Sequence, residues 1–322
     1  MSTVTLFKPV QEDIREVEKL MRAQADGHHP DLLAALDHLL SSGGKRIRPT
    51  MGLLISKMLG GDHDQMIMLA AAVELLHTAT LVHDDLIDGS LLRRGNPTLN
   101  ARWSPAATVL TGDFIFAKAA RLAAEINCLP LMRRFAETLA VIVDGELTQL
   151  FSARGLINHK NYLQRIYAKT ASLFEMSARA AAMISPVDDE IVEAMRSFGY
   201  SIGMAFQIVD DILDFTGEQA SVGKPVGSDL LQGLVTLPAL YYIENHPEDT
   251  DIIALLESEY EVEREEKERL IQAIRGSEAV AKSFKEAREF IESSIAELAN
   301  VPVGVEKQSL IDLAHYVVDR KT

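Results

Sequence analysis

The stretch "LVHDDLIDG", Leu81–Gly89, ends an apolar run with three aspartates, Asp84, Asp85 and Asp88. Residues four apart share one face of a helix, so Asp84 and Asp88 are expected to point together, with Asp85 beside them. Gly89 follows at once, which predicts that the aspartates lie near a helix C-terminus, where the helix dipole adds negative potential. Carboxylates in such a place repel one another, and bound cations would stabilise them.

The same D-D-x-x-D pattern recurs downstream in "IVDDILDFTG", residues 208–217, where Asp210 and Asp214 share a face and Asp211 flanks them. A single copy is compatible with ordinary surface acids at a helix end. Two copies, both flanked by apolar sequence, favour the interpretation that the acids form a functional site, because burial of unpaired acids is costly. Ligation by oxygen alone favours Mg²⁺, with Mn²⁺ possible, over zinc.

The composition limits the classes of function. The chain has 322 residues, is 47% hydrophobic and 6% aromatic, and has a formal net charge of -15. This mixture favours helices around a large core, and the charge argues against nucleic acid as a partner. The one cysteine, Cys128, excludes an internal disulfide framework and fits a cytoplasmic protein. We expect no signal peptide and no membrane anchor, because the longest apolar stretch, Met66–Val82, contains Glu74 and His77 and is better explained as a buried helix.

Helical periodicity runs through almost the whole chain, and no strand pattern is found. The expected helices cover 9–25, 30–42, 48–61, 66–88, 106–126, 131–153, 158–185, 187–214, 257–274 and 278–298. A polar loop is expected over 90–104, and a mobile glycine-rich loop over 216–236. No linker divides the chain, so the prediction is a single all-α domain over residues 1–322.

Basic residues gather at glycine-flanked turns of this acidic chain. The segments that carry them are "GGKRIRPT" with Lys45, Arg46 and Arg48, "LLRRGNPT" with Arg93 and Arg94, "YAKTASLF" with Lys169 and Thr170, and "SVGKPVG" with Lys224. An isolated arginine pair is usually solvated surface. The grouping favours a diphosphate ligand, since arginine makes bidentate contacts with phosphate.

These segments, in this order, resemble the trans-isoprenyl diphosphate synthases, the polyprenyl synthetase family. The resemblance covers essentially the whole chain and includes "GGKRIRP", "HDDLIDGSLLRRG", "KTASLF" and "GMAFQIVDDILDF". It implies an isoprenoid-synthase helical bundle around a central elongation cavity. It also implies a prenyltransferase that joins isopentenyl diphosphate to an allylic diphosphate, and an oligomeric state that is usually a homodimer.

The resemblance also implies roles for individual residues. Asp84, Asp88 and Asp210 would bind Mg²⁺, supported by Asp85, Asp211 and Asp214. The allylic diphosphate would contact Arg93, Lys169 and Lys224, with Gln207 on the metal side. Thr170 would lie near the developing cation. Isopentenyl diphosphate would contact Lys45, Arg48, His77 and Arg94. Leu234 departs from the family pattern, which often has lysine there, so one diphosphate contact is missing or supplied elsewhere. His83 is expected to be structural.

The helix before Asp84 predicts the product length. Members with short products carry a bulky aromatic four or five residues before this aspartate, where this chain has Thr80 and Ala79. Leu76 lies about one turn further from Asp84 on the same helix. One helical turn, about 5.4 Å, is comparable in length to an isoprene unit. We therefore expect a long-chain product beyond four isoprene units, roughly C30–C50.

Four alternatives stay open at this point. A short-chain synthase would share every motif except the small residues of the chain-length region. A cyclising terpene synthase would not need the isopentenyl site in "GGKRIRP". A helical phosphohydrolase would use His83 and Asp84 but would leave the second aspartate motif unexplained. A catalytically silent partner subunit tends to lose an aspartate motif, whereas both are present here.

Overall fold

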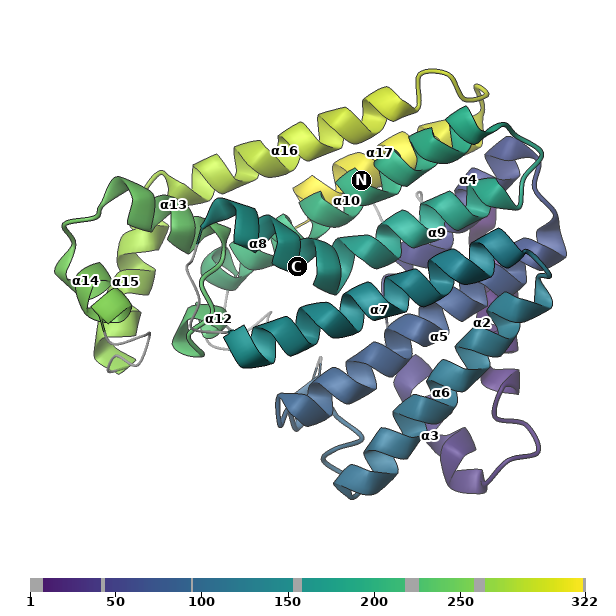
Figure 1. Cartoon of the computed structure of the whole chain (residues 1–322), viewed down its shortest axis with the longest axis horizontal. Coiled ribbons are helices and arrows are strands. Elements are labelled where there is room, and N and C mark those ends of the chain that lie inside the picture. The colour runs from purple at the N-terminus through teal and green to yellow at the C-terminus, as the bar shows by residue number, and fades with distance from the viewer. Residues whose placement is uncertain are drawn as a thin grey trace. The chain divides into compact units, whose positions relative to one another are not determined.

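The computed structural model describes residues 8–41, 44–93, 95–152, 158–217, 226–257 and 264–320. Arg94 and Lys224 therefore lie outside the described residues. Helices make up most of the described chain, with one two-stranded hairpin (Figure 1), which confirms the all-α prediction.

The chain divides into two compact units. The first comprises Met1–Thr138, Leu173–Gly199 and Glu297–Leu313, and the second comprises Leu139–Ser172, Tyr200–Ala296 and Ala314–Thr322. The backbone passes between the units several times, so neither is one continuous segment. The expectation of a single domain over 1–322 stays a prediction.

The first unit is built around the long helix α5. Its elements are η1 (Lys8–Val10), α2 (Gln11–Ala23), α3 (Pro30–Ser41), α4 (Ile47–Leu59), α5 (His63–Ile87), β1 (Leu92–Arg93), β2 (Asn96–Pro97), α6 (Pro105–Glu125), most of α9 (Ser172–Met183), and the starts of α7 (Leu129–Ser152), α10 (Asp189–Thr216) and α17 (Val305–Asp319). Helix α5 packs against α6, α4 and α2. Its start is capped by Asp62, whose Oδ1 accepts a hydrogen bond from the Gln65 N–H at 2.9 Å.

Close packing of α5 on α6 explains the position of the His83 side chain. Its imidazole lies over Gly112 of α6, where any Cβ would collide with the ring. Its Nε2 is 3.3 Å from the carbonyl oxygen of Val109. These contacts agree with the structural role expected for His83.

A small hairpin follows the first aspartate motif and corrects the prediction that strands are absent. Strands β1 and β2 form an antiparallel pair in which Leu92 faces Pro97 and Arg93 faces Asn96. Gly95 has a φ of 77°, a conformation that glycine adopts without strain. The hairpin was missed because two residues are too few to show a period of two.

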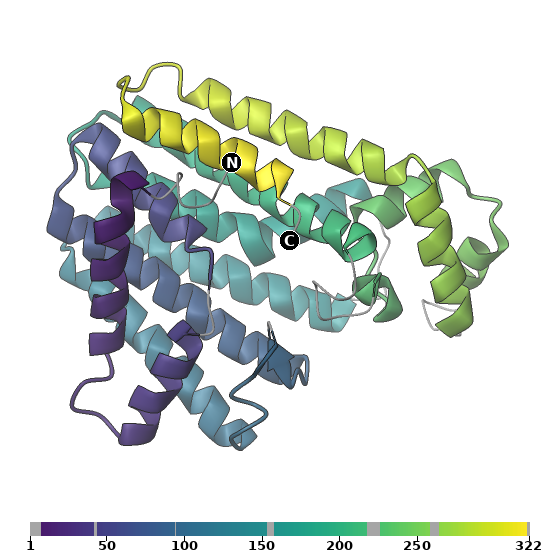
Figure 2. The same ribbon diagram turned by 180° about the vertical axis from the view of Figure 1, so that it is seen from behind.

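The second unit contains the second aspartate motif. Its elements are the remainders of α7, α10 and α17, with α8 (His159–Ile166), η2 (Tyr167–Ala171), α12 (Ser228–Leu231), α13 (Leu237–Asn245), α14 (Thr250–Glu257), α15 (Arg264–Gly276) and α16 (Ala279–Glu297). Within it, the end of α17 lies at the second half of α10 (Figures 1 and 2). Two predictions are corrected here. The helix expected over 158–185 is interrupted by η2, a π-helical turn, and the loop expected over 216–236 contains α12.

Within the described part of the chain, α5 alone is long and apolar enough to cross a membrane. In its most apolar window, 72% of the residues are buried inside the protein. This is the pattern of a core helix, as the acidic and histidine side chains in this stretch led us to expect.

Candidate active site

The first aspartate motif lies at the C-terminal end of α5, as the following glycine predicted. Asp88 caps the helix, and its N–H donates to the Asp84 carbonyl at 2.8 Å. Asp84 is half-buried and Asp88 is exposed. Asp85 points inward, and its carboxylate forms an ion pair with the Arg93 guanidinium of β1, with N–O distances of 2.8 to 3.0 Å. The hairpin therefore fixes a cation directly beside the motif.

The accessible face of α5 extends from Asp84 toward the helix start. Asp84, Thr80 and His77 are half-buried and spaced as neighbours on one helical face. Ala79 is only 2% exposed and Leu76 is fully buried. Of the two small residues expected to set the product length, Thr80 thus lies on the accessible face, and Ala79 is packed in the core.

The basic turn before α4 is built on Arg46. This residue has a left-handed φ of 47°, and its side chain reaches Glu74 at 2.8 Å and Glu18 at 3.0 Å. Burial lowers the pKa of Arg46, but the two carboxylates raise it by more, so the net shift is upward. Arg46 is therefore an anchor for the turn.

The two predicted phosphate ligands flank this anchor. Lys45 and Arg48 are half-buried at the N-terminal end of α4. The Arg48 guanidinium lies 4.4 Å from the centre of the Phe174 ring. The structure thus brings both cations to the end of a helix whose dipole also favours anions.

The second aspartate motif gives each of its three residues a different environment. Asp210 pairs with Arg320 at 2.8 Å and remains 41% exposed. Asp214 accepts hydrogen bonds at the start of α12, from the Ser228 N–H and the Asp229 N–H at 3.1 Å each and from the Ser228 hydroxyl at 2.7 Å. Asp211 points into the core and is 4% exposed. Helical spacing predicted the shared face of Asp210 and Asp214 but could not assign these partners.

Asp211 is the centre of a buried hydrogen-bond chain. The Tyr162 hydroxyl donates to Oδ2 at 2.8 Å, and Nε2 of Gln207 donates to Oδ1 at 2.8 Å. The Thr170 hydroxyl in turn donates to Oε1 of Gln207 at 2.6 Å. Burial raises the pKa of Asp211 to about 7, and the charge of Asp229 adds to the rise. Burial and the Asp211 charge also raise the pKa of Tyr162.

The predicted Lys169–Thr170 pair lies in the π-helical turn η2. Such turns occur often at functional sites, because the extra residue re-aims side chains. Lys169 Nζ reaches the Glu146 carboxylate of α7 at 3.0 Å. A Cβ added to the neighbouring Gly145 would lie 2.5 Å from the Cβ of Ala168, so glycine is needed where α7 passes this turn.

The donor chemistry fits Mg²⁺ that is shared with a ligand. Among the described residues, no three carboxylate, histidine or cysteine side chains converge on one point. Mg²⁺ is usually held by one or two carboxylates together with waters and substrate phosphates. The exposed or half-exposed carboxylates of Asp84, Asp88 and Asp210 offer such incomplete oxygen sets.

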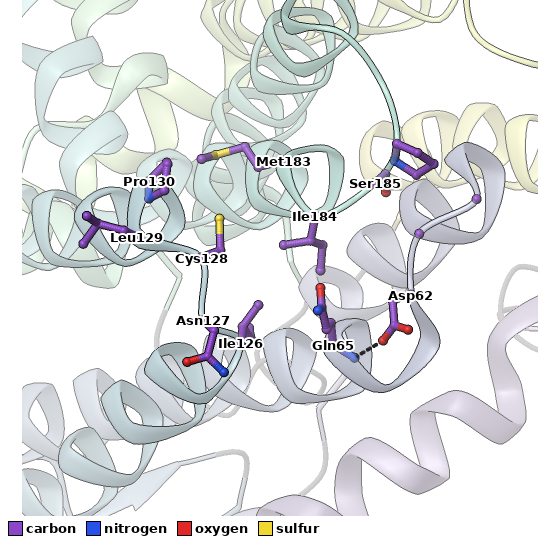
Figure 3. Close-up of a pocket in the computed structure, with 13 residues that line it drawn as sticks. Asp62, Gln65, Ile126, Asn127, Cys128, Leu129, Pro130, Met183, Ile184 and Ser185 are labelled. Atoms are coloured by element: carbon purple, nitrogen blue, oxygen red, sulfur yellow. Dashed lines mark hydrogen bonds between the residues drawn. The ribbon is translucent and has the colours of Figure 1, made fainter.

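A separate pocket lies at the other end of α5 (Figure 3). It has a volume of about 770 Å³ and is lined by the start of α5, the turn between α6 and α7, and the segment after α9. Asp62 and Asp84 are 22 residues apart in sequence, which corresponds to about 33 Å along a helix. The pocket contains none of the predicted site residues and is not the candidate active site.

The comparisons with known proteins agree with this fold and these motifs. The polyprenyl synthetase family model matches residues 29–274. Heptaprenyl diphosphate synthase component 2 of Bacillus subtilis is 37% identical over 314 residues, which are 97% of this chain and 89% of that protein. Octaprenyl diphosphate synthase of Haemophilus influenzae is 33% identical over 99% of this chain and 98% of its own.

Solved structures show the same likeness. A heptaprenyl diphosphate synthase of Staphylococcus aureus superposes with a TM-score of 0.92 at 34% identity and covers 97% of this chain and 99% of that one. A polyprenyl synthase of Caulobacter crescentus, complexed with calcium and isoprenyl diphosphate, gives a TM-score of 0.91 at 34% identity and covers 100% and 98%.

The fold and the paired aspartate motifs define an all-α prenyltransferase. The chain belongs to the polyprenyl synthetase family, with long-chain synthases among its relatives. The family, the isoprenoid-synthase fold and the enzyme class inferred from the sequence are confirmed.

Proposed function

We propose that this protein is a long-chain trans-polyprenyl diphosphate synthase that adds isopentenyl diphosphate to an allylic diphosphate with Mg²⁺ as cofactor. The observation that carries the proposal is the arrangement of cations beside carboxylates in both units. Arg93 touches the first aspartate motif. Lys169 lies on the π-helical turn η2, which is linked to Asp211 of the second motif through Gln207. Such pairs suit a polyanionic substrate that arrives with divalent metal.

The chemistry follows from charge. The C–O bond of the allylic diphosphate breaks, and its electron pair leaves with the diphosphate. The double bond of isopentenyl diphosphate attacks the allylic cation, and the resulting cation loses a proton to the released diphosphate. Bound Mg²⁺ stabilises the negative charge on the leaving diphosphate. Arg93, Lys169 and Lys224 would hold that group, with Gln207 assisting.

Other residues of the chain would bind the second substrate and orient the reacting groups. Lys45, Arg48, His77 and Arg94 would hold isopentenyl diphosphate beside the accessible face of α5. Thr170 would lie near the developing cation, positioned by its hydrogen bond to Gln207. Of the second motif, Asp210 is the better candidate for direct ligation, because Asp214 already accepts three hydrogen bonds at the start of α12. Burial of Asp211 between Tyr162 and Gln207 suits a positioning role.

Product length is proposed to depend on Thr80 first and Ala79 second, because of these two residues Thr80 lies on the accessible face of α5 and Ala79 is buried. We expect Thr80→Phe to shorten the product by one or more isoprene units. Thr80→Val, which keeps the volume, should leave the product length unchanged. An unchanged product in both Thr80→Phe and Ala79→Tyr would contradict this account of length control.

We further propose a cytoplasmic homodimer. In the first unit α6 exposes Val109 and Leu110, and in the second unit α7 exposes Val143, Leu147 and Phe151. Val143, Leu147 and Phe151 are spaced four residues apart, so they share one face of α7, and an apolar helix face of this kind suits a protein interface. Light scattering of the purified chain tests the oligomeric state, and a monomer would contradict the proposal. Because two relatives are named as a second component, a heteromeric assembly is the alternative outcome.

The activity is tested by incorporation of labelled isopentenyl diphosphate into solvent-extractable product. Incorporation should require Mg²⁺ and disappear with EDTA. Asp84→Ala and Asp210→Ala should each abolish it, whereas Asp37→Ala, which truncates a half-exposed aspartate of α3, should not. Full activity in EDTA, or in both motif variants, would refute the proposed chemistry.

A further inference from the structure

The last described residue, Arg320, is a buried cation. Its side chain is only 3% exposed, although arginine is almost never fully buried without a partner. Its Nη2 contacts the Asp210 carboxylate at 2.8 Å and donates to the Phe206 carbonyl at 2.6 Å. Its Nε donates to the Val317 carbonyl at 3.2 Å.

Arg320 holds two residues of α10 that lie one turn apart. Phe206 and Asp210 are related by four positions, so they share a face of the helix. The guanidinium carbon lies 3.8 Å from the centre of the Phe206 ring, and the same group binds the Asp210 carboxylate. The contact joins the end of α17 to the second aspartate motif through a charge-assisted hydrogen bond, a cation–π contact and a backbone hydrogen bond.

The geometry leaves Asp210 accessible while its orientation is fixed. The carboxylate is 41% exposed, whereas the arginine is nearly fully buried. Arg320 therefore reaches the Asp210 carboxylate from the interior of the protein, on the side away from solvent. A hydrogen-bonding partner of a metal-binding side chain fixes its orientation and raises the affinity for the metal.

We propose that Arg320 is a positioning residue for the second aspartate motif, one that holds the Asp210 carboxylate in the orientation that binds the metal–diphosphate. The inference rests on the proposed function, because it assumes that Asp210 meets Mg²⁺ there. The last turn of α17 is then part of the substrate site, although the aspartate motif and the arginine are far apart in sequence.

The test measures metal affinity, not turnover. Calorimetry of the full chain with an unreactive allylic thiodiphosphate, repeated over a series of Mg²⁺ concentrations, gives the Mg²⁺ concentration for half-maximal binding. Arg320→Met should raise that concentration about tenfold or more, the usual cost of losing a second partner of a metal ligand. Arg320→Lys should recover part of the loss, because it restores the charge. Arg288→Met, which removes an exposed arginine of α16, should change nothing.

The outcomes separate the two proposals. Mg²⁺-independent binding of the analogue by the wild-type chain would overturn the metal role and this inference with it. Mg²⁺-dependent binding that is unchanged or tighter in Arg320→Met would overturn this inference alone.

A second measurement does not require the Arg320 variant to fold. Hydrogen exchange on the metal-free full chain reports the last turn of α17, where the Arg320 N–H donates to the Tyr316 carbonyl at 3.1 Å. Asp210→Asn should speed exchange over residues 316–320, because it weakens the pair with Arg320. Asp84→Asn should not. Equal exchange in the two variants would show that the pair does not hold α17 to the motif, which overturns the inference.

Discussion

Replacement of Tyr162 by phenylalanine should lower the free energy of unfolding by more at high pH than at low pH. The substitution removes one hydroxyl, which donates to Oδ2 of the buried Asp211 at 2.8 Å, and leaves the ring in place. A hydrogen bond to an ionised group is worth about 1.5–3 kcal/mol, and one between neutral groups about 0.5–1.5 kcal/mol. The cost of Tyr162→Phe therefore depends on the ionisation of Asp211.

The direction of the pH dependence follows from the raised pKa of Asp211. Burial raises this pKa from 3.8 to about 7, so the folded protein prefers the protonated carboxyl. The stability that this preference contributes is fully present below the unfolded pKa and is lost as pH rises through about 7. The hydrogen bond from Tyr162 stabilises the ionised Asp211 carboxylate, so it limits this loss of stability. In Tyr162→Phe the stability should therefore continue to fall to a higher pH.

Urea unfolding in EDTA, at about pH 5 and about pH 9, measures the effect. We expect Tyr162→Phe to lower the free energy of unfolding by about 1 kcal/mol at the lower pH and by about 2–3 kcal/mol at the higher one. In an Asp211→Asn background the two losses should become equal, since no charge remains to respond. If Tyr162→Phe alone lost the same free energy of unfolding at both pH values, or lost more at the lower pH, Asp211 would not be the cause of the pH dependence.

Two further substitutions test how the fold supports the site. Arg46→Met leaves Glu74 buried without its cation, so the free energy of unfolding should fall by about 3–5 kcal/mol, whereas truncation of an exposed, singly paired arginine costs under about 1 kcal/mol. A loss of the smaller size at Arg46 would show that the turn before α4 does not depend on this ion pair. Gly145→Ala drives a Cβ against Ala168 and should displace the π-helical turn, which would weaken binding of an allylic thiodiphosphate measured by calorimetry. Gly276→Ala, where nothing lies within 4 Å, is the matched control, and equal binding in the two variants would contradict the proposed role of the turn.

Local sequence pattern was sufficient for most of the helices and for the charged residues of the candidate site, but no helix was delimited over α13, α14 or α17. Apolar spacing of 3.6 residues predicted helices whose ends mostly agree with the structure to within a few residues. The glycine after each aspartate motif correctly predicted that both motifs lie at helix ends. The resemblance to a known family rested on these same short segments.

Contacts between distant segments could not be predicted in this way. Tyr162 and Arg320 reach the second motif from α8 and from the end of α17, and neither is marked by any local pattern. Spacing placed Asp211 beside its neighbours but could not show that its carboxylate turns into the core. The π-helical turn at Lys169 was missed because one extra residue barely disturbs helical periodicity.

We propose that this chain makes long polyprenyl diphosphates in a metal-dependent reaction. The most direct measurement incubates the purified protein with Mg²⁺, labelled isopentenyl diphosphate and, separately, allylic starters of ten, fifteen and twenty carbons. Product length is then read by mass spectrometry. We expect a ladder of products that extends beyond twenty carbons and vanishes with EDTA. Products that stop at fifteen or twenty carbons would contradict the long-chain claim, and the absence of any incorporation would contradict the synthase activity itself.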